Sequence, residues 1–185
     1  MPKNKKKLLK KIIEIEFQMF ENVRSNQPSL CQENPGAFKL MREMNHSALS
    51  YDTLKSYLKD LKTAKSKGRN LMTEKYARMN NLIPPLKVNP LIQKIVSIES
   101  GWMDELSNQY PLSVNHKPNY FIKYLSCELE TYSNNSIELY LKDIQIAKEN
   151  GANLAKKRFD HLAKELGYSS LKELEFKRKN ESRSN

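Results

Sequence analysis

The feature that most constrains this chain is an internal repeat, because the sequence matches itself when it is shifted by 83 positions. In that register Tyr57–Asp60 falls on Tyr140–Asp143, and Gly68 falls on Gly151. Residues 8–79 align without a gap, with about 18 identities in about 72 pairs where chance gives about 4. A match of this kind predicts that one structural unit occurs twice in the chain.

Each unit shows the periodicity of amphipathic helices. Apolar residues recur at helical spacing between breakers such as Pro35 and Gly68, and no convincing strand alternation is present in the sequence. The expected helices of the first unit cover about residues 5–24, 37–49, 52–67 and 70–79. Since the second unit repeats them, we expect an all-α fold. It is a tandem duplication of a three- to four-helix unit, packed as one helical domain with pseudo-two-fold or solenoid-like symmetry.

Breakers and charges divide the chain into five segments. Pro84 and Pro85 mark a link between the two units, and lysine-rich stretches lie at both ends. Ser170 and Glu173 have the spacing of a capping box, which predicts a short helix after the second unit. The expected segments are a basic N-terminal tail at 1–7, repeat one at 8–79, a linker at 80–90, repeat two at 91–167, and the short helix with a basic C-terminal tail at 168–185.

The net charge of +11, from 32 Lys and Arg against 21 Asp and Glu, invites a nucleic-acid interpretation. Abundant lysine and asparagine with scarce alanine are typical of an AT-rich genome, so part of this charge is a compositional background. The local excess lies at the two ends, where blocks of like charge are usually solvated tails. Sequence-independent contact of these tails with phosphates is an alternative, so nucleic-acid binding is not the favoured function.

Composition and motifs exclude several classes of protein. With 5 glycines there is no phosphate-cradling loop, and 2 cysteines form neither a disulfide framework nor a four-ligand zinc site. No apolar run approaches the ~18 residues of a membrane span, and the basic start lacks the apolar stretch of a signal peptide, so we expect a cytoplasmic protein without a membrane partner. Glu43 and His46 form a lone Glu-x-x-His pair where a di-iron site needs two, so we expect no metal and no cofactor.

Two glutamates lie in the middle of apolar helix stripes. At about 100° per residue, Glu16 and Glu99, which are equivalent in the repeat register, face inward. Arg42 faces inward on the second expected helix, where the other unit has Leu125, so we expect a buried ion pair between Glu16 and Arg42. For Glu99 we expect a tyrosine hydroxyl or Lys94 as the partner.

Two interpretations of these buried charges are open. In the first, Glu16, Arg42 and Glu99 only hold helices together, because buried polar residues usually satisfy one another. In the second, the two glutamates and Glu128 line a cleft between the repeats, where they bind a cation or act as acid and base.

Polar residues that occur in only one repeat form a second group of candidates. Residues kept in both units most simply serve the fold, so one-copy residues are the better candidates for function. The densest group of this kind is Arg69, Asn70, Glu74, Lys75, Tyr76 and Arg78. The alternative interpretation is an ordinary solvated helix face.

Much of the first unit resembles a known family. The residues that carry the resemblance are Glu16, Met19–Phe20, Cys31–Gln32, Phe38, Met41–Arg42, Tyr57, Asp60–Leu61, Ala64, Gly68–Leu71 and, most specifically, Glu74–Met79. They resemble the bacterial domain-of-unknown-function family 4125, and the second unit matches more loosely, so the resemblance covers most of the chain. It implies no established activity, and through some members it implies an association with a nucleotidyltransferase-like domain.

Three functions are compatible with these residues. The favoured one is a non-catalytic module that binds a protein partner, such as a nucleotidyltransferase-like protein, or a small ligand between the repeats. The first alternative is a small-molecule enzyme, with Glu16 or Glu74 as acid–base and Arg42, Arg69 or Lys75 as the anchor of an anion. The second alternative is weak nucleic-acid binding through the basic tails. The candidate binding residues are Glu16, Gln32, Arg42, Arg69, Asn70, Glu74, Lys75, Tyr76, Arg78, Glu99 and Glu128.

Overall fold

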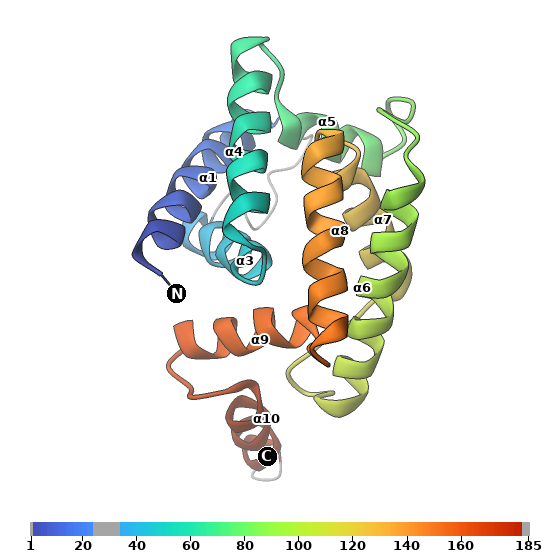
Figure 1. Ribbon diagram of the computed structural model, residues 1–185. Helices are drawn as coiled ribbons and strands as arrows, with labels where there is room; N and C mark the ends of the chain where they lie inside the picture. Colours follow the sequence, from blue (N-terminus) through green and yellow to red (C-terminus); the bar gives the residue numbers. More distant parts are fainter. Residues whose placement is uncertain (1, 24–33, 183–185) are drawn as a thin grey trace.

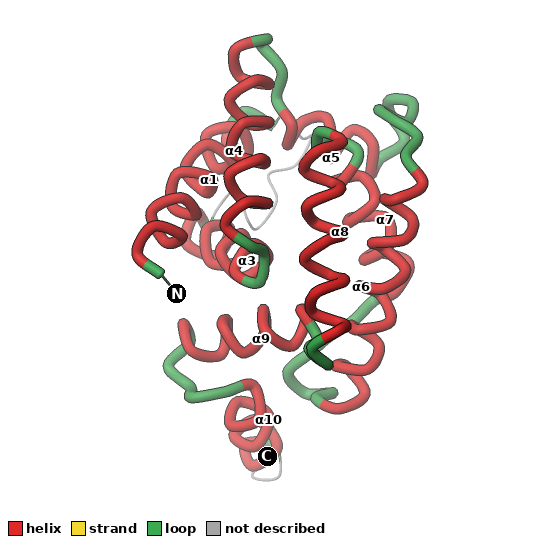
Figure 2. Tube along the Cα trace, viewed as in Figure 1, coloured by secondary structure: helices red, strands yellow, loops and turns green. Residues whose placement is uncertain are grey.

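The computed structural model describes residues 2–23 and 34–182, and over these ranges the chain forms helices and no strand (Figures 1 and 2). The prediction of an all-α fold is therefore confirmed for the described residues. Gln32 and the other residues between 24 and 33 lie outside them. The helices are α1 Lys3–Glu21, α3 Pro35–Ser47, α4 Tyr51–Ser66, α5 Leu71–Met79, α6 Pro90–Gln109, α7 Pro118–Leu129, α8 Asn134–Glu149, α9 Leu154–Glu165 and α10 Leu171–Glu181.

Local sequence signals explain where these helices begin and end. The side chains of Asn70 and Asn153 accept hydrogen bonds from backbone N–H groups of the first turns of α5 and α9. Gly68 and Gly151 follow α4 and α8 with φ angles of +67° and +61°, a left-handed conformation that glycine adopts without steric cost. The Ser170 hydroxyl accepts from the N–H of Glu173, so the predicted helix at the C-terminal end starts as expected.

Helices occupy most of the two end segments in which basic tails were expected. The α1 helix starts at Lys3, so most of the expected tail at 1–7 is the first turn of that helix, and the Lys5 ammonium donates to the Ser47 carbonyl at 2.8 Å. At the other end, α10 continues to Glu181. None of the helices in the described part of the chain combines the length and the apolar composition that a membrane span requires.

Helix packing divides the molecule into two groups. Helix α1 packs against α3, α4 and α5, and helix α6 packs against α7, α8 and α9. Contacts between the groups join α3 to α9, α4 to α8 and α5 to α7. Because α4 and α8 lie side by side at the centre (Figure 1), the apolar core is continuous through both groups.

Two aspartates join α4 to α8. The Asp60 carboxylate accepts from the Ser133 N–H at 3.0 Å, at the start of α8, and the Asp143 carboxylate accepts from the Ser50 N–H at 2.8 Å, at the start of α4. Each carboxylate thus lies at the positive end of the opposite helix dipole, where a negative charge is stabilising. The aspartates kept in both sequence units therefore serve the fold, as predicted.

Candidate functional site

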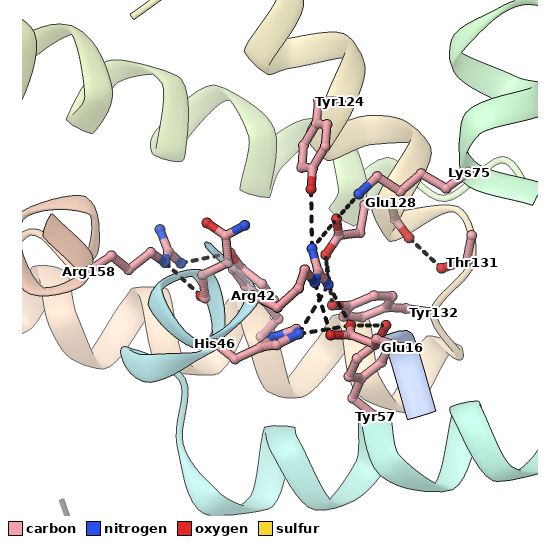
Figure 3. A network of polar contacts seen from close by, with 12 residues as sticks. Glu16, Arg42, His46, Tyr57, Lys75, Tyr124, Glu128, Thr131, Tyr132 and Arg158 are labelled. Atoms are coloured by element: carbon pink, nitrogen blue, oxygen red, sulfur yellow. Dashed lines mark hydrogen bonds and ion pairs between the residues drawn. The ribbon is translucent and has the colours of Figure 1, made fainter. Parts of the chain in front are cut away.

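A buried ion pair between α1 and α3 forms the centre of a polar network (Figure 3). The Glu16 side chain is 0 % exposed, and it accepts from Nε and Nη2 of Arg42 at 2.9 and 2.5 Å. The Tyr57 hydroxyl donates to the same carboxylate at 2.8 Å, and the Nε2 atom of His46 lies 2.9 Å from it. The predicted pair of Glu16 and Arg42 is confirmed.

Arg42 extends the network from α3 to α7 and α5. Its Nη1 and Nη2 atoms donate to the Glu128 carboxylate at 3.0 and 2.9 Å, and Nη1 also donates to the Tyr124 hydroxyl at 3.2 Å. The Lys75 ammonium donates to Glu128 at 2.7 Å. Four helices thus supply an alternating row of charges, Glu16, Arg42, Glu128 and Lys75, that is neutral in sum.

The cations of this row keep both carboxylates ionised. Burial opposes ionisation of Glu16, but the positive charge of Arg42 and the contact with His46 outweigh it and lower the pKa of that carboxyl to about 2. Burial opposes ionisation of Glu128 as well, and there the charges of Arg42 and Lys75 lower the pKa well below its ordinary range. Both groups are therefore negatively charged at neutral pH.

We expect this ionisation to make the protein sensitive to acid. Between pH 4.5 and about 2, the unfolded state binds a proton at Glu16 that the folded state does not, so stability rises with pH in this window. The contribution of Glu16 is about 3 kcal/mol, complete above about pH 5 and lost as the pH falls towards 2. Urea unfolding followed by circular dichroism at pH 7 and pH 3 measures it. Glu16→Gln should reduce the loss of stability between these two pH values, and an unchanged loss would contradict the assignment.

A second buried pair fixes the other group of helices. Glu99 is 0 % exposed, and it accepts from Nη1 and Nη2 of Arg158 on α9 at 2.6 and 2.8 Å and from the Tyr140 hydroxyl at 3.0 Å. Nε of Arg158 also donates to the backbone carbonyl of Asn45 on α3 at 3.0 Å. The expected tyrosine hydroxyl is confirmed, whereas Lys94 is exposed and was the wrong cation.

The same charges reach a cavity of about 510 Å³ between α3, α7 and α9. Its apolar walls include Phe38, Met41, Met44, Met103, Phe121, Leu125 and Phe159. The polar and charged groups that line it include Arg42, Asn45, His46, Lys75, Glu128 and Arg158. The cavity therefore combines a mostly apolar lining with a small group of converging polar side chains, which is the usual character of a site for a small molecule.

The candidate glutamates divide between the cavity and the core. Glu128 lines the cavity, as the interpretation with a cleft predicted. Glu16 and Glu99 are not among the residues that line it, and their oxygens are occupied by Arg42 and Arg158. The two glutamates that the repeat makes equivalent thus hold helices together.

The one-copy group on α5 also divides. Lys75 and Tyr76 line the cavity. The Asn70 side chain caps α5 and donates to the Met19 carbonyl at 2.7 Å.

The remaining members of that group, Arg69, Glu74 and Arg78, form ion pairs outside the cavity. Arg69 is 48 % exposed in its side chain and forms a paired hydrogen bond with Glu74 at 2.8 and 2.7 Å. Arg78 donates to Glu130 at 2.7 and 3.1 Å and to the Ile83 carbonyl at 3.0 Å, so it holds the linker against α7. These three residues do not lie in the cavity.

The residues that line the cavity and were not among the sequence-based candidates include His46, Asn45 and Arg158. His46 lies four residues after Arg42, on the same face of α3, and this spacing was an available signal. Arg158 lies four residues after the buried Leu154 of α9, which is the same kind of signal. The sequence pattern of a single helix does not show that α9 packs on α3, so Arg158 could not be paired with Asn45.

Among the described residues, Glu43, His161 and Glu165 place one possible metal-ligand atom each within 4.8 Å of one another. The Nε2 atom of His161 lies 3.6 Å from the Glu43 carboxylate, between α9 and α3. Nitrogen and oxygen ligands of this kind suit zinc, although exposed acidic groups are common without an ion. The two side chains of the pair noted in the sequence contact different residues, since His46 contacts Glu16 in the core and Glu43 contacts His161.

Comparisons with curated proteins and with solved structures found no match. The family model described as "Protein of unknown function (DUF4125)" matches residues 6–176. The match runs from Lys6 within α1 through α9 and so includes every residue of the buried network and of the cavity. The chain therefore belongs to the DUF4125 family.

Proposed function

We propose that the protein is a non-catalytic binding module that takes a small organic molecule into the cavity between its two groups of helices. The observation that carries this proposal is the cavity of about 510 Å³ with apolar walls and charged groups at one side. Pockets for small ligands usually measure about 300–1,000 Å³ and have this mixed lining. Binding of a protein partner, including a nucleotidyltransferase-like one, stays the alternative.

We further infer that the two groups arose by duplication and are related by a pseudo-two-fold axis between α4 and α8. Equivalent contacts support this inference, since the Tyr57 hydroxyl donates to Glu16 and the Tyr140 hydroxyl donates to Glu99. The helix contacts support it as well, because the pairings of α3 with α9 and of α5 with α7 exchange under such an axis.

The cavity lies where the proposed symmetry is broken. The positions equivalent to Arg42 and His46 hold Leu125 and Leu129, and the position equivalent to Glu128 holds Asn45. The Arg42–Glu128 pair and the His46 contact therefore have no counterpart at the equivalent positions, although each group of helices has a buried glutamate with its own cation. Asymmetric polar residues in an otherwise repeated core point to a function that the fold alone does not require.

The electrostatics favour binding over acid–base catalysis. A general acid or base works best with a pKa near the operating pH. Arg42 and Lys75 instead hold the pKa of Glu128 well below its ordinary range, although burial opposes them. Glu16 is sealed behind Arg42 and does not line the cavity. Glu74, the other residue considered as acid–base, pairs with Arg69 outside the cavity, so neither candidate is placed to exchange a proton with a ligand there.

Filling the cavity tests the proposed function. We expect N-phenyl-1-naphthylamine, a neutral apolar fluorophore, to bind the wild-type protein with a rise in fluorescence. Leu125→Trp places a larger side chain at the cavity wall and should weaken this binding at least about tenfold, because the probe and the indole compete for the same space.

A matched control separates the cavity from the rest of the surface. Leu82→Trp makes the same change at a residue that is 75 % exposed and does not line the cavity, and it should leave the affinity unchanged. Equal affinities of the wild type and of Leu125→Trp, with both proteins folded by circular dichroism, would overturn the proposal.

A further inference from the structure

Lys75 is the cation in the cavity with unused hydrogen-bonding capacity. Its side chain is 1 % exposed and lines the cavity. An ammonium group carries three N–H donors, and among the described residues Lys75 has one acceptor, the Glu128 carboxylate at 2.7 Å. The ammonium also lies over the ring of Tyr124, 3.6 Å from its centroid. Buried donors without an acceptor are costly, so the remaining N–H groups favour a ligand that accepts them.

The other two buried cations are already engaged. The guanidinium of Arg42 donates to Glu16, Glu128 and the Tyr124 hydroxyl, which occupies its five N–H groups. Arg158 donates to Glu99, to the Tyr140 hydroxyl and to the Asn45 carbonyl. A ligand that enters the cavity therefore finds its strongest available donor at Lys75.

The charges that line the cavity are mostly positive. Arg42, Lys75 and Arg158 line it from within and Lys117 joins them at the start of α7, whereas Glu128 is the acidic residue among the lining side chains. Glu16 and Glu99 balance the arginines but lie outside the lining. The cations thus lie on the side of the cavity and the acidic partners of the two arginines lie behind them, an arrangement that favours a negative group on the ligand.

We propose, on the basis of the binding function above, that the ligand is an organic anion with an apolar aromatic body and that Lys75 receives its negative group. The apolar walls, which include Phe121 and Phe159, hold the body, and the Lys75 ammonium forms a charge-assisted hydrogen bond with the anionic group. Glu128 and Tyr124 position the ammonium for this contact.

Two related fluorophores test the proposal. 8-Anilinonaphthalene-1-sulfonate is N-phenyl-1-naphthylamine with a sulfonate added, so the pair differs in one anionic group. We expect the wild type to bind the sulfonate at least about tenfold more tightly than the neutral probe, and we expect Lys75→Met to remove this preference while it changes the affinity for the neutral probe less than about twofold.

Two control variants isolate the role of the charge. Lys75→Arg keeps a cation and should keep the preference for the sulfonate. Lys59→Met removes one positive charge at an exposed position of α4 outside the cavity, and it should change neither affinity. Thermal unfolding of each variant identifies any that does not fold, and Lys75→Arg keeps the test decisive if Lys75→Met is such a variant.

The outcomes separate the two proposals. If the neutral probe binds in a way that Leu125→Trp weakens but the sulfonate gains nothing, the anion proposal is wrong and the binding function stands. If Lys75→Met weakens both probes equally, or Lys75→Arg loses the preference, the charge of Lys75 is not the determinant and the proposal is wrong. If neither probe responds to Leu125→Trp, the binding function itself fails.

Discussion

Arg42→Met is expected to lower the free energy of unfolding by about 5 kcal/mol at pH 7, because removing one member of a buried ion pair leaves an uncompensated charge in the core. Arg42 is the shared partner of two carboxylates, Glu16 and Glu128, so the expected cost lies at the upper end of the usual range. Urea unfolding followed by circular dichroism measures the loss. Since small domains are stable by about 5–15 kcal/mol, this single change brings the protein close to unfolding.

The double variant Glu16→Gln with Arg42→Met tests the cause. It removes the Glu16 carboxylate, which has lost its cation, together with Arg42. Glu128 keeps its hydrogen bonds from the Lys75 ammonium and the Tyr132 hydroxyl. Removing both charges of a buried pair is far less costly than removing one, so the double variant should be more stable than Arg42→Met by at least about 2 kcal/mol. A double variant that is less stable than Arg42→Met would show that Arg42 acts through packing.

The pH dependence gives an independent measure of the same charge. Without Arg42, burial should raise the pKa of the Glu16 carboxyl above its value in the unfolded chain. A group with a raised folded-state pKa makes stability fall as the pH rises, so Arg42→Met should gain stability from pH 7 to pH 5 while the wild type does not.

Arg69→Met is the matched surface control for this change. Arg69 also pairs with a glutamate, Glu74, but its side chain is 48 % exposed, and exposed pairs contribute about 0–1 kcal/mol. Equal losses of stability in Arg42→Met and Arg69→Met would contradict the burial argument.

Helical periodicity was sufficient to place Glu16, Glu99 and Arg42 on buried faces. Glu16 and Arg42 each interrupt an apolar stripe, and a charge in that place needs a partner. Two inward-facing residues of opposite charge on successive helices leave few alternatives, so their pairing could be predicted. Glu99 was harder, because its cation, Arg158, lies 59 positions later on a helix whose packing against α6 the local sequence does not specify.

Comparing the two repeat units identified only some of the residues that line the cavity. A polar residue that occurs in one copy can bind a ligand, cap a helix or pair on the surface, and the sequence does not distinguish these uses. Lys75 and Arg78 are both cations of the candidate group on α5, three residues apart, yet Lys75 lies in the cavity and Arg78 binds Glu130 beside the linker. What separates them is the face of α5 that α7 covers, which is a tertiary property.

The sequence suggested a cleft near Glu128 as one of two interpretations, but it did not give the walls of the cavity. Its walls come from α3, α7 and α9, and it exists because their side chains leave space between them. Aromatic residues at helical spacing, such as Phe121 and Tyr124, have the sequence pattern of core residues. Both line the cavity. The pattern could not show this, because core side chains and pocket side chains have the same periodicity.

Arg158→Met and Lys75→Met remove cations from equivalent positions of the repeat, and we expect them to have different effects on stability. Arg158 is the cation of Glu99, whose carboxylate is 0 % exposed and otherwise accepts from the Tyr140 hydroxyl among the described residues. Arg158→Met should therefore cost about 3–5 kcal/mol. Lys75→Met leaves Glu128 with both hydrogen bonds from Arg42, so it should cost less, about 2 kcal/mol.

Urea unfolding of the two variants under the same conditions measures this difference. If they lose equal stability, Lys75 is as much a part of the structural network as Arg158, and its availability to a ligand loses its physical basis. If they differ as expected, Arg158 stabilises the fold, whereas the equivalent residue Lys75 is available to a ligand. The reason is that Glu128 keeps its two hydrogen bonds from Arg42 when Lys75 contacts a ligand.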